Sequence, residues 1–181
     1  MVIDVAVDSY ESLELLISYE KSRGNIQYIN ELFKTVAKHE RYLPIVKLLV
    51  ENGADINHVS VYPDGLEDYP CLSYAVNGGA YENVKYLIEN GADVDFSKID
   101  YSSRWVISFN ILSYLLSYGA DVNVQDRSYG DTILMAAVKL GIAKYVEEIL
   151  KFSPSLTLKN NKGQTALEIA KEKNIKTLFN Y

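Results

Sequence analysis

Few residues of the chain have the type and spacing that catalysis or metal binding requires. His39 and His58 have no Ser or Cys at motif spacing on which to act, and Gly78-Gly79 is not followed by the Lys-Ser/Thr of a phosphate-binding loop. Cys71 is the single cysteine, so an intrachain disulfide is excluded, and one cysteine with two histidines is too few for an ordinary structural zinc site. We therefore predict that the protein is not an enzyme and has no catalytic residue, metal or cofactor.

Two pairs of acidic side chains are the remaining candidates for acid–base chemistry. They are Glu67-Asp68 and Glu147-Glu148. A glycosidase-like reaction needs two carboxyl groups that face each other across the substrate. The members of each pair are instead adjacent in the sequence, so we interpret both pairs as solvated charge.

Length, composition and charge restrict the remaining classes of protein. The 181 residues are 48% apolar, which is enough for one domain with a core. No window approaches 18 uninterrupted apolar residues, and Asp4 and Asp8 stand where a secretory signal would carry Lys or Arg, so we predict a cytoplasmic protein without membrane contact. Residues 1–100 hold 17 acids and 8 bases, a net charge of −9, and residues 101–181 hold 7 acids and 10 bases, a net charge of +3. The overall charge of −6 argues against a nucleic-acid partner, because phosphates require a concentrated Lys/Arg surface.

One sequence motif recurs along the chain, at residues 45–57, 83–95 and 111–123. Each copy has apolar residues at helical spacing, such as Val84, Leu87 and Ile88, followed by Gly-Ala-Asp. The glycine can adopt the left-handed conformation that closes a helix. Residues 145–156 form an eroded fourth copy in which Ser153 takes the place of the glycine, so we expect Ser153 to be left-handed. The spacings between the four positions are 38, 28 and 34 residues.

A shorter helix is also predicted at residues 132–137, before the fourth copy, and again at residues 165–170. Each segment begins with a Thr that can cap a helix and continues with Leu and small Ala on one face. Residues 70–79 are a weaker relative. A short helix, a turn, a second helix and a glycine stop therefore recur.

These patterns resemble ankyrin repeats, a family whose unit of about 33 residues opens with Thr-Pro-Leu-His-x-Ala and closes with Gly-Ala-Asp-Val-Asn. The resemblance covers roughly residues 30–178 and implies an all-α solenoid of stacked helix-turn-helix units with finger loops. It implies a single domain over 1–181, with an N-terminal capping helix region at 1–29, repeats at 30–57, 66–95, 101–123 and 130–158, and a C-terminal capping repeat at 163–181. Ser73, Met135 and Glu168 stand at the His position of the opening tetrad, so the hydrogen bonding between Thr and His is absent or replaced.

The irregular spacings and the chain ends give further expectations. The connection 58–69 is about five residues longer than a family finger, so we expect an enlarged loop. The 28-residue interval leaves room only for a truncated first helix around 102–108, where Trp105 would fill the missing volume. This repeat is the predicted weak point of the array. At the ends we expect capping helices, one opening near residues 8–11 and closing at 23–24, the other at 171–179. The first should carry its apolar residues at Leu13, Leu15, Leu16 and Ile17, and a degenerate first helix should follow from Asn30 to Lys38.

The resemblance implies a protein–protein interaction module that binds its partner through the concave face and the finger loops. Carried over position by position, the partner-binding residues are Leu66, Glu67, Tyr69, Asn77, Arg127, Ser128, Tyr129, Asp131, Lys139 and Lys162. Further contact positions correspond to Val138, Asn161, Gln164 and Lys173. Residues 49–100 contain ten acids against Lys85 and Lys98, which favours a partner protein with a basic patch.

Several alternatives remain open at this stage. A narrower version of the interaction hypothesis is a small inhibitor or immunity-type protein that occludes an enzyme. A different class is a small-molecule site or enzyme in the irregular middle repeat, around Arg104 and Trp105. A third is self-association through the solenoid ends or through Trp105, although we expect a monomer. The bias toward Ile, Lys, Asn and Tyr is similar to ankyrin-repeat proteins of large DNA viruses and intracellular bacteria, in which case the cytoplasm would be that of a host.

Overall fold

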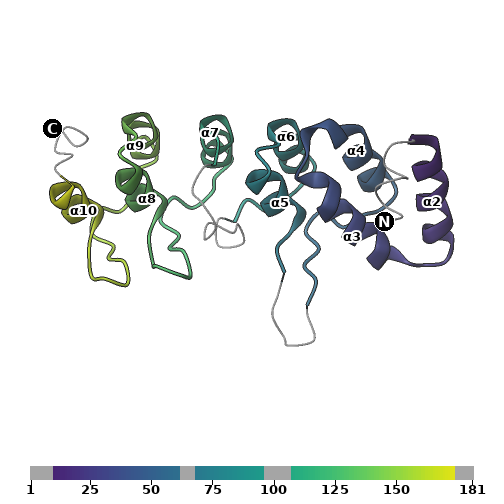
Figure 1. The fold of residues 1–181 in the computed structure, drawn as a ribbon, viewed down its shortest axis with the longest axis horizontal. Helices are drawn as coiled ribbons and strands as arrows, with labels where there is room; N and C mark the ends of the chain where they lie inside the picture. The colour runs from purple at the N-terminus through teal and green to yellow at the C-terminus, as the bar shows by residue number, and fades with distance from the viewer. Residues whose placement is uncertain (1–9, 62–67, 96–106, 174–181) are drawn as a thin grey trace. The chain divides into compact units, whose positions relative to one another are not determined.

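The computed structural model describes residues 10–61, 68–95 and 107–173 (Figure 1). Its internal contacts divide the chain into two compact units, residues 1–93 and 94–181. The described elements are helices, and an isolated antiparallel bridge joins Gln125 and Thr132. The prediction of an all-α repeat fold is confirmed.

In its described residues, the N-terminal unit has two helix pairs preceded by helix α2. Its elements are α2 (Tyr10–Ser22), α3 (Ile26–Ala37), the 3₁₀ helix η1 (Glu40–Tyr42), α4 (Leu43–Glu51), α5 (Cys71–Asn77) and α6 (Tyr81–Glu89). The first helices α3 and α5 pack against each other, as do the second helices α4 and α6. Helix α2 packs on α3 and α4 and so covers one end of the unit (Figure 1).

Helix α2 lies where we expect an N-terminal capping helix, but its apolar face differs from the expectation at one residue. Leu13 and Ile17 are buried, but Leu15 is 73% exposed. Leu15 lies two residues after Leu13, which rotates it roughly 200° around the helix and away from the core. Gly24, with φ of +71°, ends the segment as expected. Residues 8 and 9, the predicted cap, lie outside the described residues.

Helix α3 begins at Ile26, earlier than the predicted Asn30. The cause is Asn25, whose side chain caps the helix by accepting a hydrogen bond from the backbone N–H of Tyr28 at 3.4 Å. Asn30 is instead buried inside the helix, where its Oδ1 accepts from the N–H of Asp55 at 3.0 Å. A polar residue was therefore mistaken for a helix start because its partner lies 25 residues away.

The glycine stops behave as the repeated motif predicts. Gly53, Gly91 and Gly119 have φ of +93°, +93° and +89°. Asn57 and Asn123, each four residues after one of these glycines, form hydrogen bonds to the next copy of the motif. Asn57 accepts from the N–H of Asp93 at 2.8 Å and donates to the carbonyl of Gly91 at 3.0 Å, and Asn123 accepts from the N–H of Ser155 at 2.7 Å. The motif therefore contains both the end of a helix and a hydrogen bond to the next copy.

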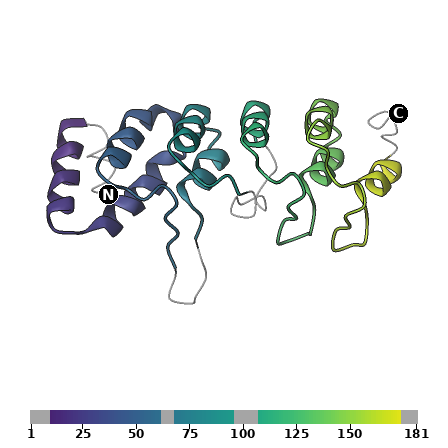
Figure 2. The ribbon, with the colours of Figure 1, turned by 180° about the vertical axis from the view of Figure 1, so that it is seen from behind.

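The C-terminal unit contains α7 (Phe109–Ser117), α8 (Ile133–Leu140), α9 (Ala143–Leu150) and α10 (Ala166–Glu172). Second helices α7 and α9 are neighbours, first helices α8 and α10 are neighbours, and α8 and α9 form a pair (Figure 2). Ser108 caps α7, accepting from the N–H of Ile111. The predicted truncated helix, with Arg104 and Trp105, falls almost entirely outside the described residues. The same holds for most of the predicted closing helix at 171–179, because α10 ends at Glu172 and the description ends at Lys173.

The missing His of the opening tetrad is replaced in the last two first helices. The hydroxyl of Thr132 accepts from the N–H of Met135 at 3.3 Å, and the N–H of Thr132 meets the Met135 sulfur at 3.4 Å. Thr165 and Glu168 form the same box, with 3.2 Å and 2.7 Å between the corresponding atoms. The hydrogen bond from the Thr165 backbone holds the pKa of Glu168 below its ordinary value.

Ser153 adopts the left-handed conformation that its place in the repeat predicts. Its φ is +52°, and it is the only non-glycine residue with positive φ in the described part of the chain. Because a Cβ atom is unfavourable there, Ser153→Gly is expected to stabilise the protein by about 1 kcal/mol. Urea unfolding followed by circular dichroism measures this. Ser153→Ala, which keeps the Cβ and removes only the hydroxyl, should give no gain; a gain of equal size would show that the backbone is not the cause.

Candidate partner-binding groove

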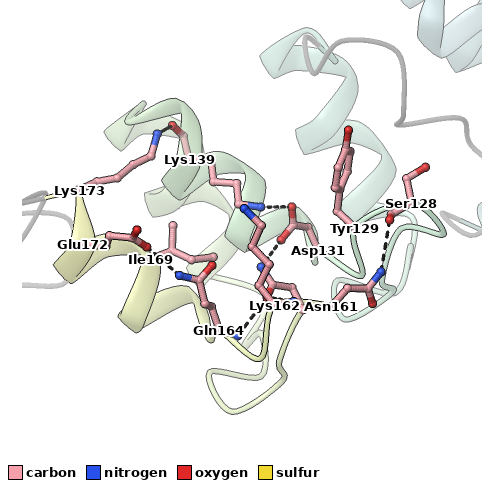
Figure 3. Close-up of a pocket in the computed structure, with 11 residues that line it drawn as sticks. Ser128, Tyr129, Asp131, Lys139, Asn161, Lys162, Gln164, Ile169, Glu172 and Lys173 are labelled. Carbon is pink, nitrogen blue, oxygen red and sulfur yellow. Dashed lines mark hydrogen bonds and ion pairs between the residues drawn. The ribbon is translucent and has the colours of Figure 1, made fainter.

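An open groove of about 920 Å³ lies in the C-terminal unit (Figure 3). It is bordered by two finger loops, residues 126–131 and 160–165, and by the first helices α8 and α10. Its lining residues are Ser128, Tyr129, Asp131, Lys139, Asn160, Asn161, Lys162, Gln164, Ile169, Glu172 and Lys173. Ser128, Tyr129, Asp131, Lys139 and Lys162 are predicted partner-binding residues, and the structure brings them together.

The first finger is shaped by the carboxylate of Asp126. This side chain is buried and accepts hydrogen bonds from the backbone N–H groups of Ser128, Tyr129 and Asp131, at 2.8, 2.7 and 2.8 Å. Such a side-chain cap folds the backbone into a tight loop. As a result the Tyr129 side chain stands at the surface, 58% exposed.

Asn160 shapes the second finger in the same way, by accepting hydrogen bonds from its backbone. Its Oδ1 accepts from the N–H groups of Lys162 and Gln164, both at 3.0 Å. Its Nδ2 donates to the carboxylate of Asp131 at 2.8 Å. Asn160 was not among the predicted site residues. Its alignment with Asp126, 34 residues earlier, is the signal that could have identified it.

The two fingers are joined by further hydrogen bonds. The N–H of Asn161 donates to the carbonyl of Tyr129 at 2.9 Å, and Gln125 Nε2 donates to the carbonyl of Lys159 at 2.8 Å. The fingers also approach closely at Gly130, whose φ is +66°: a Cβ added there would lie 2.5 Å from Asn161 Oδ1 and 3.1 Å from the Asn161 backbone nitrogen. The floor of the groove is therefore held in one arrangement before any partner binds.

The charged side chains around the groove differ in their ion-pair and hydrogen-bond partners. Asp131 is buried and forms an ion pair with Lys139 in addition to its bond from Asn160. Lys173 donates to the carbonyl of Lys139, and Glu172 accepts from Gln164 Nε2 at 2.7 Å. Figure 3 shows the side chain of Lys162 extending from its finger toward the pair of Lys139 and Asp131. Asp131 thus positions groove residues, whereas Lys162 is exposed.

Comparison with family models matches residues 67–98 to the ankyrin repeat and residues 104–181 to a model of three ankyrin-repeat copies. Together the matches cover more than half of the chain. The protein belongs to the ankyrin-repeat family. A search of curated proteins finds no match. Ankyrin repeats are in general protein–protein interaction modules, and proteins of the family are typically non-enzymatic.

Asn161, Gln164 and Lys173, three of the further predicted contact positions, also line the groove, whereas the remaining predicted contact residues of the ankyrin repeats do not. Arg127 is exposed on the first finger, outside the lining set, and Val138 is fully buried, so its prediction as a contact residue is wrong. Tyr69 is half-buried and Asn77 exposed, both in the N-terminal unit. Leu66 and Glu67 lie outside the described residues.

The interpretation of Asp68 as solvated charge is wrong. Its side chain is 8% exposed, and its carboxylate lies 2.7 Å from the ammonium of Lys34, whose side chain is 5% exposed. We call the residues Glu31, Lys34, Ser60, Asp68 and Tyr74 the finger-base cluster, because they hold the two ends of the long ankyrin finger. Lys34 also reaches Glu31 at 2.8 Å and Ser60 Oγ at 3.0 Å, and the Tyr74 hydroxyl donates to Asp68 at 2.8 Å.

The finger-base cluster shifts the protonation of its members. Burial alone would raise the pKa of Asp68, but hydrogen bonds from Lys34, from the Tyr69 backbone and from Tyr74 hold it below its ordinary value. Burial would likewise lower the pKa of Lys34, yet the hydrogen bonds to Asp68 and Glu31 raise it. Lys34, Asp68 and Glu31, whose pKa is also lowered, are therefore the ionised members of the cluster at neutral pH.

Glu148 is also more than solvated charge. It is buried on α9 and accepts from Ser113 Oγ on α7 at 2.6 Å and from Lys151 at 2.7 Å, and these bonds lower its pKa. Its role is to connect the second helices of adjacent ankyrin repeats.

The residues considered for nucleophilic or metal chemistry have ordinary surroundings. Cys71 is buried in α5, and burial raises the pKa of its thiol, which makes it a poor nucleophile. His39 is exposed and His58 half-buried beside Ser60. Within residues 10–61, 68–95 and 107–173, no three His, Cys, Asp or Glu side chains gather as a metal site would require. No helix in these segments combines the length and apolar character needed to cross a membrane.

Proposed function

We propose that this ankyrin-repeat protein binds a partner protein and that the groove between fingers 126–131 and 160–165 is a contact surface. The observation that carries the proposal is the convergence of Ser128, Tyr129, Lys139 and Lys162, which come from two fingers and a first helix, on one groove. Fingers and first helices are the surface that an array of this type offers to other molecules.

The chemistry of the groove supports this use. Tyr129 presents a large exposed ring with a polar end, the kind of side chain that dominates the binding energy of many interfaces. The hydrogen bonds between the fingers keep the groove in one arrangement, so less conformational entropy is lost on binding.

The proposed contribution of the N-terminal unit is narrower than the sequence suggests. Tyr69, which is half-buried, and Asn77, which is exposed, are proposed as further contact residues. The acids of residues 49–100 still predict a partner with a basic patch. Asp68 does not take part, because its charge is already paired with Lys34.

Photo-crosslinking in the full chain tests the proposal. A photoreactive phenylalanine is placed at Tyr129, and in a matched control at Tyr118, which is 50% exposed at the end of α7 and outside the groove. We expect the probe at 129 to give a discrete protein adduct in cell extract that excess unlabelled wild type suppresses and excess Tyr129→Ala does not. Equal adducts from both positions, or adducts that both competitors suppress equally, would reject the groove as the contact surface.

A further inference from the structure

We infer that the groove of the C-terminal unit selects an acidic segment of the partner protein, one carrying at least two carboxylates. This inference rests on the proposed binding function and adds the chemistry of the partner. It differs from the sequence-based expectation of a partner with a basic patch, which concerns the acidic N-terminal half of the chain.

The balance of charge in the groove is the first argument. Two carboxylates, Asp131 and Glu172, line it, against three ammonium groups, those of Lys139, Lys162 and Lys173. Asp131 is buried and neutralised by Lys139. In the part of the chain that the structure describes, no carboxylate forms an ion pair with Lys162 or Lys173. The groove therefore presents more positive than negative charge to a ligand.

The surroundings of the groove strengthen this positive potential. Arg127 is exposed on the same finger as Ser128 and Tyr129. After the hydrogen bonds from Thr165, the charges of Lys159 and Lys171 also lower the pKa of Glu168, on the first turn of the helix that borders the groove. Residues 101–181 as a whole carry a net charge of +3 while residues 1–100 carry −9. An acidic segment would thus be repelled by the first half of the chain and attracted by the second.

Hydrogen-bond donors stand where carboxylates would lie. The ammonium of Lys162 extends into the groove (Figure 3), and Lys173 uses one hydrogen bond on the carbonyl of Lys139, which leaves further N–H donors. The hydroxyl groups of Ser128 and Tyr129 are exposed on the finger. Hydrogen bonds between ionised groups are stronger than those between neutral groups, so carboxylates gain most from this set. The Tyr129 ring then offers apolar area to the residues that flank the acids.

Selection from a peptide library gives the test. Random dodecapeptides displayed on phage are selected on the immobilised full chain, and the most enriched peptide is synthesised with a fluorescent label. Its affinity is measured by anisotropy for wild type, Lys162→Gln, Lys162→Gln/Lys173→Gln, Tyr129→Ala and the control Lys171→Gln. Lys171 is an exposed lysine of α10 that does not line the groove. Circular dichroism confirms that each variant is folded.

We expect the selected peptides to be rich in Asp and Glu and to lose binding when these become Asn and Gln. Lys162→Gln should weaken binding about fivefold and the double variant more than tenfold, whereas Lys171→Gln should change it less than about twofold. Added salt should weaken binding to the wild type more than to the double variant.

Other outcomes overturn the inference. Neutral or basic peptides that depend on Tyr129 would show that the groove binds a different chemistry, which leaves the proposed function standing. An acidic peptide that Lys171→Gln weakens as much as Lys162→Gln would reveal general attraction without a site. Peptides that bind the Tyr129→Ala and Lys162→Gln/Lys173→Gln variants as tightly as the wild type would count against both the inference and the proposal that the groove is a contact surface. The absence of any enriched peptide would do the same.

Discussion

Gly78→Ala is expected to destabilise the N-terminal unit by about 3 kcal/mol or more, a large part of the stability of an ordinary domain. Gly78 ends α5 with φ of −78° and ψ of −10°, a conformation open to any residue, so backbone strain is not the reason. A Cβ atom there would lie 1.9 Å from the backbone oxygen of Lys38 and 2.6 Å from its carbonyl carbon. Backbone cannot rotate away as a side chain can, so the turn after α5 would have to separate from the end of α3.

The adjacent glycine supplies a matched control. Gly79 has φ of +68°, and a Cβ atom added to it would have no atom within 4 Å, so Gly79→Ala should cost only about 1 kcal/mol through its backbone conformation. Urea unfolding of both variants, followed by circular dichroism, compares them directly. Equal losses, or a larger loss for Gly79→Ala, would refute the close approach between Gly78 and Lys38.

Lys34→Met is expected to destabilise the same unit by roughly 3 kcal/mol at neutral pH, because it leaves the buried carboxylate of Asp68 without its cation. The double variant Lys34→Met/Asp68→Asn should regain much of this loss, since no buried carboxylate then lacks its cation; Glu31, the other partner of Lys34, has a side chain that is 49% exposed. Lys38→Met, at an exposed lysine just beyond α3, should have little effect. If the double variant were as unstable as the single one, lost packing and not the unpaired charge would be responsible.

The pH dependence of the Lys34→Met effect follows from the pKa of Asp68. In the wild type this pKa is lowered, so the stability it contributes is present above the ordinary Asp value of about 3.9 and is lost as the pH falls through the lower folded value. Without Lys34 the burial of Asp68 remains and its pKa rises. Protonation then relieves the buried charge, so the difference between variant and wild type should shrink between about pH 7 and pH 4. A difference that stays constant over this range would contradict the proposed ion pair.

The sequence predicts only part of the candidate site. It identifies residues by their place in the repeat, but it does not identify a residue whose role depends on a partner far away in the sequence. The positions of Ser128, Tyr129, Lys139 and Lys162 were available from their place in the repeat. Their neighbour Asn160 was missed, because its function depends on Asp131, 29 residues away. Asp131 was correctly placed at the groove, yet only the structure shows that its carboxylate is engaged by Lys139 and Asn160.

The sequence by itself determined the repeated helix pairs, the glycine stops at 53, 91 and 119, the left-handed Ser153 and the Thr caps at 132 and 165. All of these depend on neighbours within about four residues or on the φ angle of one residue, and such local preferences are visible as a pattern. Only the tertiary structure decided that Asp68 is buried against Lys34, 34 residues away, and that Gly78 touches Lys38. Whether a charge is solvated or paired depends on which distant segment packs over it, and residue type alone carries no information about that segment.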